Sequence, residues 1–164
     1  MKSFIKRVFF AVLGIIMLEA VMVAVEYFGG QPMGLFSGTR PPGLGYTNGK
    51  FSPPLWKPNC VSSTVEKSDK HYIEPLAFSI APEVAWKRLQ GVIRESPRAH
   101  VVQDSPVYLY AEFKSLGLGF VDDVEFALDD KAAVIHVRSA SRLGVRDFNV
   151  NRARIESLRA QLAK

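Results

Sequence analysis

Apolar and polar positions follow two periods in the part of the chain beyond residue 70. A period of two, with Leu109, Ala111 and Phe113 on one side, is typical of strands that bury one face. Short apolar runs bounded by turn residues favour strands as well. We therefore expect strands at residues 71–79, 99–102, 107–115, 120–128 and 134–139.

Helical spacing predicts two helices among these strands. Pro82 suits a first helical turn, and that helix should end before Pro97. Its apolar stripe is Ala85, Trp86, Leu89, Val92 and Ile93. A second helix begins near Asn149, with an inner stripe of Ile155, Leu158 and Leu162. The order β-α-β-β-β-β-α predicts an α+β fold, in which an antiparallel sheet of about four to five strands carries both helices on one face.

An apolar run at residues 8–25 follows Lys2, Lys6 and Arg7, and Glu19 alone interrupts it. As a helix, about 18 residues reach roughly 27 Å, close to the roughly 30 Å of a bilayer core. Because no Ala-x-Ala-like cleavage site follows, residues 1–28 predict a transmembrane signal anchor rather than a cleaved signal peptide. The preceding basic residues predict a single-pass protein with a cytoplasmic N-terminus and an extracytoplasmic domain, periplasmic in a Gram-negative cell.

Residues 29–58 are rich in glycine and proline, which excludes a regular helix or a central strand. They predict a linker, or an arm packed on the α+β domain at residues 59–164. The formal net charge is +5, and part of it belongs to the three basic residues before the apolar run. No long Lys/Arg run is present, so we expect a membrane partner through residues 8–28 and no nucleic acid.

Four strings carry a resemblance to a known family. They are PNCVSS at 58–63, AEFKS at 111–115, FVDDVEF at 120–126 and RSASR at 138–142, the last followed by Gly144, Asp147 and the pair Asn151–Arg152. Together they resemble the family called domain of unknown function 1499, over residues 40–162. The resemblance implies a bacterial envelope or plastid protein and implies no particular activity. Many members carry a second cysteine six residues before the cysteine of this string. Pro54 stands there in this chain, so a disulfide or paired-cysteine metal site is not expected.

Candidate catalytic groups are few. Cys60 is the one cysteine, and a free cysteine is most often buried. A thiolate with His71 as a nearby base would instead be a nucleophile. Asp122 and Asp123 are alternative groups for a hydrolase or transferase. No metal-ligand spacing or glycine-rich phosphate loop is present, so we expect no metal and no cofactor.

A dense polar segment follows the last strand and enters the second helix. Helix N-termini attract anions, and the first turn here has no acid. Candidate anion ligands are Arg138, Ser139, Ser141, Arg142, Asn151 and Arg152. In the alternative interpretations, Arg142 or Arg152 pairs with Asp122 or Asp123 to lock the fold, or the charges form a solvated, salt-bridged sheet face. We expect a binding or interaction module for an anionic small molecule, a lipid headgroup or an envelope protein, with a hydrolase or transferase as the alternative.

Overall fold

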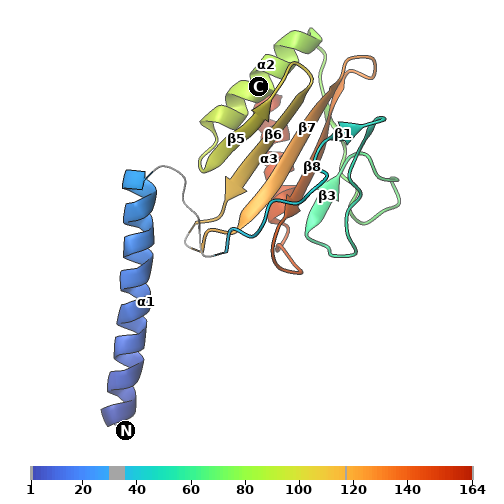
Figure 1. Cartoon of the computed structure of the whole chain (residues 1–164). Helices are drawn as coiled ribbons and strands as arrows, with labels where there is room; N and C mark the ends of the chain where they lie inside the picture. The colour runs from blue at the N-terminus through green and yellow to red at the C-terminus, as the bar shows by residue number, and fades with distance from the viewer. Residues whose placement is uncertain (1, 30–35, 117, 164) are drawn as a thin grey trace.

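The computed structural model describes residues 2–29, 36–116 and 118–163, and in the first range the side chains of residues 6–21. Its centre is an antiparallel sheet in the order β3-β8-β7-β6-β5, with β4 also pairing with β8 (Figure 1). These strands are β3 (Cys60–Ser62), β4 (Leu76–Ala77), β5 (Ala99–Asp104), β6 (Tyr108–Lys114), β7 (Val121–Asp129) and β8 (Val134–Ser141). A separate hairpin pairs β1 (Tyr46–Thr47) with β2 (Lys50–Phe51).

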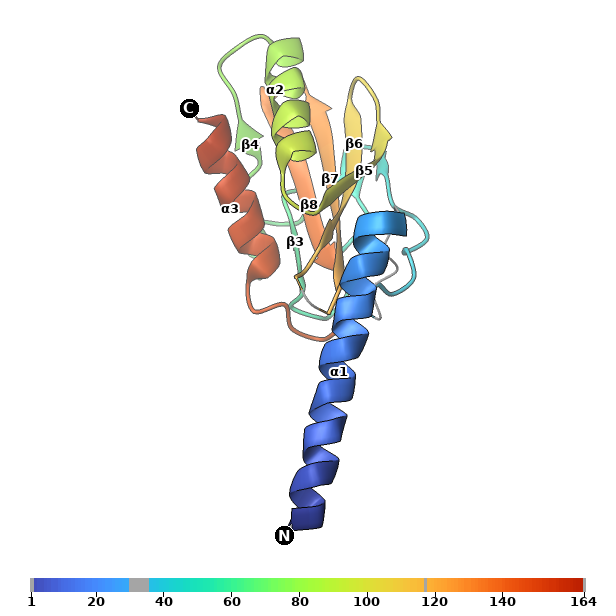
Figure 2. The same ribbon diagram turned by 90° about the vertical axis from the view of Figure 1, so that its left-hand side faces the viewer.

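Two helices, α2 (Pro82–Glu95) and α3 (Val150–Leu162), cover the same face of the sheet (Figure 2). Helix α2 begins with its proline in the first turn and ends before Pro97, as the sequence predicted. The core lies between the helices and the sheet, where Leu89, Ile93, Phe126 and Ile155 have no exposed surface. Burial of such side chains is the main stabilising term for this layer, at about 1.5–3 kcal/mol each.

The predicted sheet of about four to five strands is wrong, because six strands form the main sheet. The added strand, Cys60–Ser62, is only three residues long and buried throughout, so it has no alternating pattern to detect. The strand expected at residues 71–79 is reduced to Leu76–Ala77. Pro75 interrupts that segment, and proline lacks the N–H that a ladder requires.

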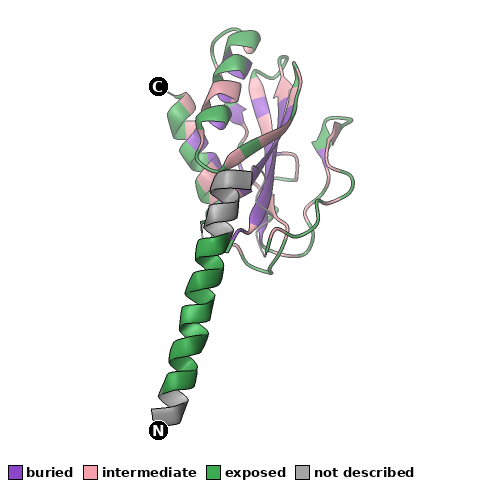
Figure 3. Cartoon of the chain, turned by 60° about the vertical axis from the view of Figure 1, so that its left-hand side comes forward, coloured by how far each residue is buried: buried purple, intermediate pink, exposed green. Residues whose placement is uncertain are grey.

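The predicted transmembrane helix is also wrong. Among the described residues, no helix is both long enough and apolar enough to cross a bilayer. Helix α1 (Lys2–Gly29) has described side chains at residues 6–21, about 24 Å of helix. That stretch includes Lys6, Arg7 and Glu19, and its described side chains are exposed (Figure 3).

The segment at residues 38–52, called the arm below, crosses the sheet face opposite the helices (Figure 1). Phe51 is its buried anchor, with 5% of its surface exposed. Gly38 has a φ of +64°, and a Cβ there would lie 3.0 Å from Leu143 Cγ. A side chain at Gly38 would therefore be both strained and crowded, so glycine lets the arm start close to the sheet.

Candidate functional site

The sheet face under the arm carries ionised side chains on adjacent strands. The register pairs Glu112 with Asp123 between β6 and β7, and Glu125 with Arg138 between β7 and β8. Alternation places them on the opposite side from Val124, which belongs to the core. The arm lies over this face, so these charges sit between two layers of protein.

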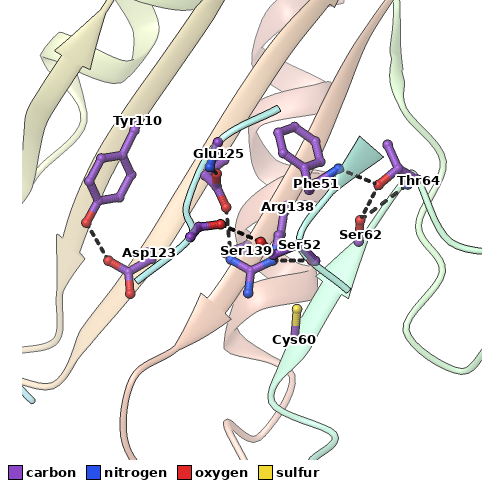
Figure 4. A network of polar contacts seen from close by, with 12 residues as sticks. Phe51, Ser52, Cys60, Ser62, Thr64, Tyr110, Asp123, Glu125, Arg138 and Ser139 are labelled. Carbon is purple, nitrogen blue, oxygen red and sulfur yellow. Dashed lines mark hydrogen bonds and ion pairs between the residues drawn. The ribbon is translucent and has the colours of Figure 1, made fainter. Parts of the chain in front are cut away.

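Glu125 and Arg138 form the first charge centre, and Glu125 has no exposed surface. Arg138 Nη1 donates to Glu125 Oε2 at 2.9 Å. The other carboxylate oxygen accepts from Tyr108 Oη at 2.8 Å and from the Gly45 backbone N–H at 2.7 Å. Arg138 Nε donates to the Ser52 carbonyl at 3.1 Å (Figure 4). Arg138 is therefore engaged by a carboxylate and by the arm, and is not presented to a ligand.

Arg142 forms the second charge centre. Its Nε lies 3.1 and 3.0 Å from the two oxygens of Asp123, and its Nη2 donates to Glu112 Oε1 at 2.5 Å. Arg40, in the arm, donates to the same Glu112 oxygen from Nε at 2.9 Å and from Nη2 at 2.6 Å. Two arginines and two carboxylates thus neutralise each other. The interpretation in which Arg142 pairs with Asp123 is confirmed.

Glu112 and Tyr110, at the second charge centre, have pKa values far from neutral pH. Burial raises the pKa of Glu112, but hydrogen bonds from Arg142 and Arg40 outweigh it and lower this pKa to about 2. Burial, followed by the hydrogen bond to Asp123, raises the pKa of Tyr110. A general acid or base works best with a pKa near the operating pH. Neither side chain meets that condition.

Asp122 lies on the helix-covered face and belongs to a third polar group. Arg154 Nη2 donates to Asp122 Oδ2 at 2.5 Å. Arg154 Nη1 donates to Ser139 Oγ at 3.0 Å and to Asn151 Oδ1 at 2.8 Å. The Asn151 amide nitrogen donates to Ser141 Oγ at 2.9 Å. This third polar group therefore joins the sheet to α3. Arg154 contacts Asp122 and Ser139 on the strands, and Asn151 contacts Ser141.

Cys60 and His71 do not form a nucleophile–base pair. Burial raises the pKa of the Cys60 thiol to about 11, so the thiol is protonated at neutral pH. His71 Nδ1 lies 2.7 Å from Asp69 Oδ1, and Nε2 lies 3.0 Å from the Lys57 carbonyl. Both ring nitrogens face other oxygen atoms, which leaves neither to accept the thiol proton.

Cys60 and His71 do line one small pocket, together with Arg152 of the predicted anion site. The pocket has a volume of about 130 Å³ and is lined by Pro58, Cys60, Val61, Lys70, His71, Asp147, Asn149 and Arg152. Arg152 Nη2 donates to the Tyr72 carbonyl at 2.8 Å and to the Lys70 carbonyl at 3.3 Å, so Arg152 does not pair with Asp122 or Asp123. We call this the cationic pocket.

Asp147 lies just before the N-terminus of α3. Its Oδ2 accepts from the Asn151 backbone N–H and from Asn151 Nδ2, both at 3.0 Å, and its Oδ1 accepts from the Asn149 backbone N–H at 3.2 Å. The first turn itself has no acid. Asp147 nevertheless complements the helix dipole from just outside the helix.

A row of Ser63, His136 and Asp129 resembles a catalytic triad and was not predicted. Ser63 Oγ lies 3.1 Å from His136 Nδ1, and His136 Nε2 lies 3.8 Å from Asp129 Oδ2. The second distance is too long for a hydrogen bond. Ser63 Oγ also accepts from the Val137 backbone N–H at 2.9 Å, which makes it part of the β8 ladder. The row is better explained as structural.

Sequence reasoning missed Arg40, Lys70 and Arg154, and it named Asp147 without assigning it a role. Asp147 had a detectable signal, since an acid just before a predicted helix is a common cap. Arg40 had none, because a glycine- and proline-rich arm has no periodicity that fixes its register on the sheet. Among the described residues, no group of three or more His, Cys, Asp or Glu side chains is arranged to hold a metal ion.

Comparison with known proteins confirms the resemblance seen in the sequence. A family model described as "Protein of unknown function (DUF1499)" matches residues 50–162. No curated protein and no solved structure matches the chain.

Proposed function

Because the chain belongs to the DUF1499 family, whose description names no activity, we propose its function from its own geometry: it binds a small anionic group in the cationic pocket. The observation that carries this proposal is the meeting of Lys70, His71 and Arg152 around one pocket. Arg138 and Arg142, by contrast, are each neutralised by a carboxylate at 2.9 Å or less.

The charge balance of the pocket favours an anion. Asp147 is the acid in its lining, and its two oxygens are engaged at the start of α3. His71 faces a carboxylate on one side and a carbonyl on the other. Lys70 and Arg152 then outnumber the single carboxylate of the lining.

The size of the pocket limits the ligand. At about 130 Å³, the pocket is smaller than the roughly 300–1,000 Å³ of a site that encloses a drug-sized ligand. That space suits one phosphate or carboxylate group, attached to a larger molecule that extends into solvent. Arg152 donates from Nη2 to two carbonyls. Its guanidinium has further N–H donors for bidentate contact with such a group.

The alternative, a hydrolase or transferase, receives less support from the same residues. Cys60 carries a protonated thiol, and Asp122 and Asp123 are paired with Arg154 and Arg142. An accessible, activated nucleophile would require these partners to separate. The predicted location outside the cytoplasm stays a prediction.

Calorimetric titration of the full chain with inorganic phosphate measures the phosphate affinity and tests the proposal. Arg152→Gln should weaken phosphate binding about tenfold, the value of one lost charge-assisted hydrogen bond. Arg159→Gln is the matched control, because Arg159 also lies on α3 and donates to two backbone carbonyls, those of Glu74 and Pro75. Equal phosphate affinity in the two variants, or no binding by the native chain, would overturn the proposal.

A further inference from the structure

The connections at one end of the main sheet expose large apolar side chains. The register places the end of β6, the start of β7, the end of β8 and the start of β3 together, so the described loop residues 52–59, 115–116, 118–120 and 142–149 share this end. It is the lower end of the sheet in Figure 1. We call it the loop end. Its exposed apolar residues are Leu55, Trp56, Leu116, Leu118, Leu143, Val145 and Phe148.

Two aromatic side chains dominate the loop end. Phe148 is 90% exposed and Trp56 is 72% exposed. Phe148 also has a left-handed backbone with a φ of 52°, which is rare for a bulky residue, and it directly precedes Asn149, the N-cap residue of α3. Large apolar side chains placed in solvent by separate loops mark an interaction surface.

Basic residues accompany these apolar side chains. Lys57, Arg98 and Arg146 lie in connections at the loop end, and Arg98 and Arg146 are exposed. The acid in these connections is Asp147, which caps α3. The opposite end of the sheet carries acids as well, namely Asp104, which is paired with Arg94, and Asp129 and Asp130 in a turn that also holds Lys131.

We infer that the loop end docks onto an anionic lipid surface. Protruding aromatic and leucine side chains insert into the interfacial layer, and the surrounding lysine and arginine side chains attract anionic headgroups. A lipid surface fits these residues because they are spread over three loop tips and require no shaped partner. The inference does not depend on the cationic pocket, whose ligand is tested separately.

Tryptophan fluorescence of the full chain measures docking directly. Trp86 is 3% exposed and reports from the core, whereas Trp56 reports from the loop end. Vesicles of phosphatidylglycerol should shift Trp56 emission to the blue, and brominated acyl chains should quench it. Vesicles of phosphatidylcholine should have a much smaller effect, and added salt should weaken the response to phosphatidylglycerol.

Phe148→Asp should lower the vesicle affinity reported by Trp56 about tenfold or more, since it removes one inserted aromatic ring. Val107→Asp is the matched control, because Val107 is 58% exposed at the opposite end and should leave docking unchanged. Arg152→Gln should keep the Trp56 blue shift and quenching, because the aromatic side chains insert without the cationic pocket, and loss of both signals in this variant would overturn the inference. Vesicle binding without Trp56 quenching, or equal quenching by neutral and anionic vesicles, would overturn the inference. So would a blue shift that grows with protein concentration in the absence of lipid, since that indicates self-association.

Discussion

Arg142 and Asp123 are joined by three short contacts, from Nε to both carboxylate oxygens at 3.1 and 3.0 Å and from Nη2 to Oδ1 at 2.7 Å. Asp123 has only 1% of its surface exposed. The pair connects β7 to the loop that leaves β8. Its geometry is that of a buried structural ion pair. Removal of one partner from such a pair leaves the other charge buried without a counter-charge.

Arg142→Ala should therefore destabilise the domain by about 3–5 kcal/mol. The substitution leaves Asp123 buried and uncompensated, and Glu112 keeps only its contacts with Arg40 and Tyr110. Urea unfolding followed by circular dichroism measures the change. Arg146→Ala, at an exposed arginine in the same loop, should change stability by less than about 0.5 kcal/mol. A native-like stability for Arg142→Ala would show that the ion pair contributes little.

Acid should weaken the contact between the arm and the sheet only at very low pH. Burial opposes ionisation of Glu112, yet its arginine contacts lower the pKa to about 2, below the roughly 4.3 of an unfolded glutamate. A lowered pKa stabilises the fold above the unfolded value, and this contribution is lost as the pH falls toward 2. Arg40→Gln removes one source of the lowering, so its stability should fall by a smaller amount in acid, and the fall should end at a higher pH than in the native chain. Urea midpoints measured over this pH range would show the difference, and Glu112→Gln should abolish it.

Long strands and amphipathic helices were predictable because their side chains alternate or recur against one core. Val124 and Phe126 in β7, or Leu89 and Ile93 in α2, show this directly. The Cys60–Ser62 strand was not predictable, since it is buried on both sides and is fixed by backbone pairing with β8.

The candidate site was predictable in its residue types but not in its pairings. Arg40 and Glu112 are separated by 72 positions, and no local pattern indicates that they meet. Arg138, Arg142 and Arg152 look equivalent in the sequence. The fold gives the first two carboxylate partners and gives Arg152 backbone carbonyls. Arg152 is the one of these three arginines that lines the cationic pocket.

Cys60 should react slowly with thiol reagents in the folded chain. Its side chain is buried, and burial raises the thiol pKa to about 11, so little thiolate is present near neutral pH. Labelling with iodoacetamide, measured by mass spectrometry, should become fast only in denaturant. Rapid labelling of the folded chain would contradict this description and would restore the nucleophile interpretation.

Asp147 should have opposite effects on stability and on anion binding. Asp147→Ala removes the acceptor for two backbone N–H groups at the start of α3, at a cost of about 0.5–2 kcal/mol. The same change removes the carboxylate from the cationic pocket, so phosphate should bind more tightly. Asp147→Asn keeps an acceptor oxygen while removing the charge, and should raise phosphate affinity with a smaller loss of stability. Calorimetry and thermal unfolding of the two variants separate capping from charge. If both variants bind phosphate more weakly than the native chain, Asp147 organises the pocket instead of opposing the anion.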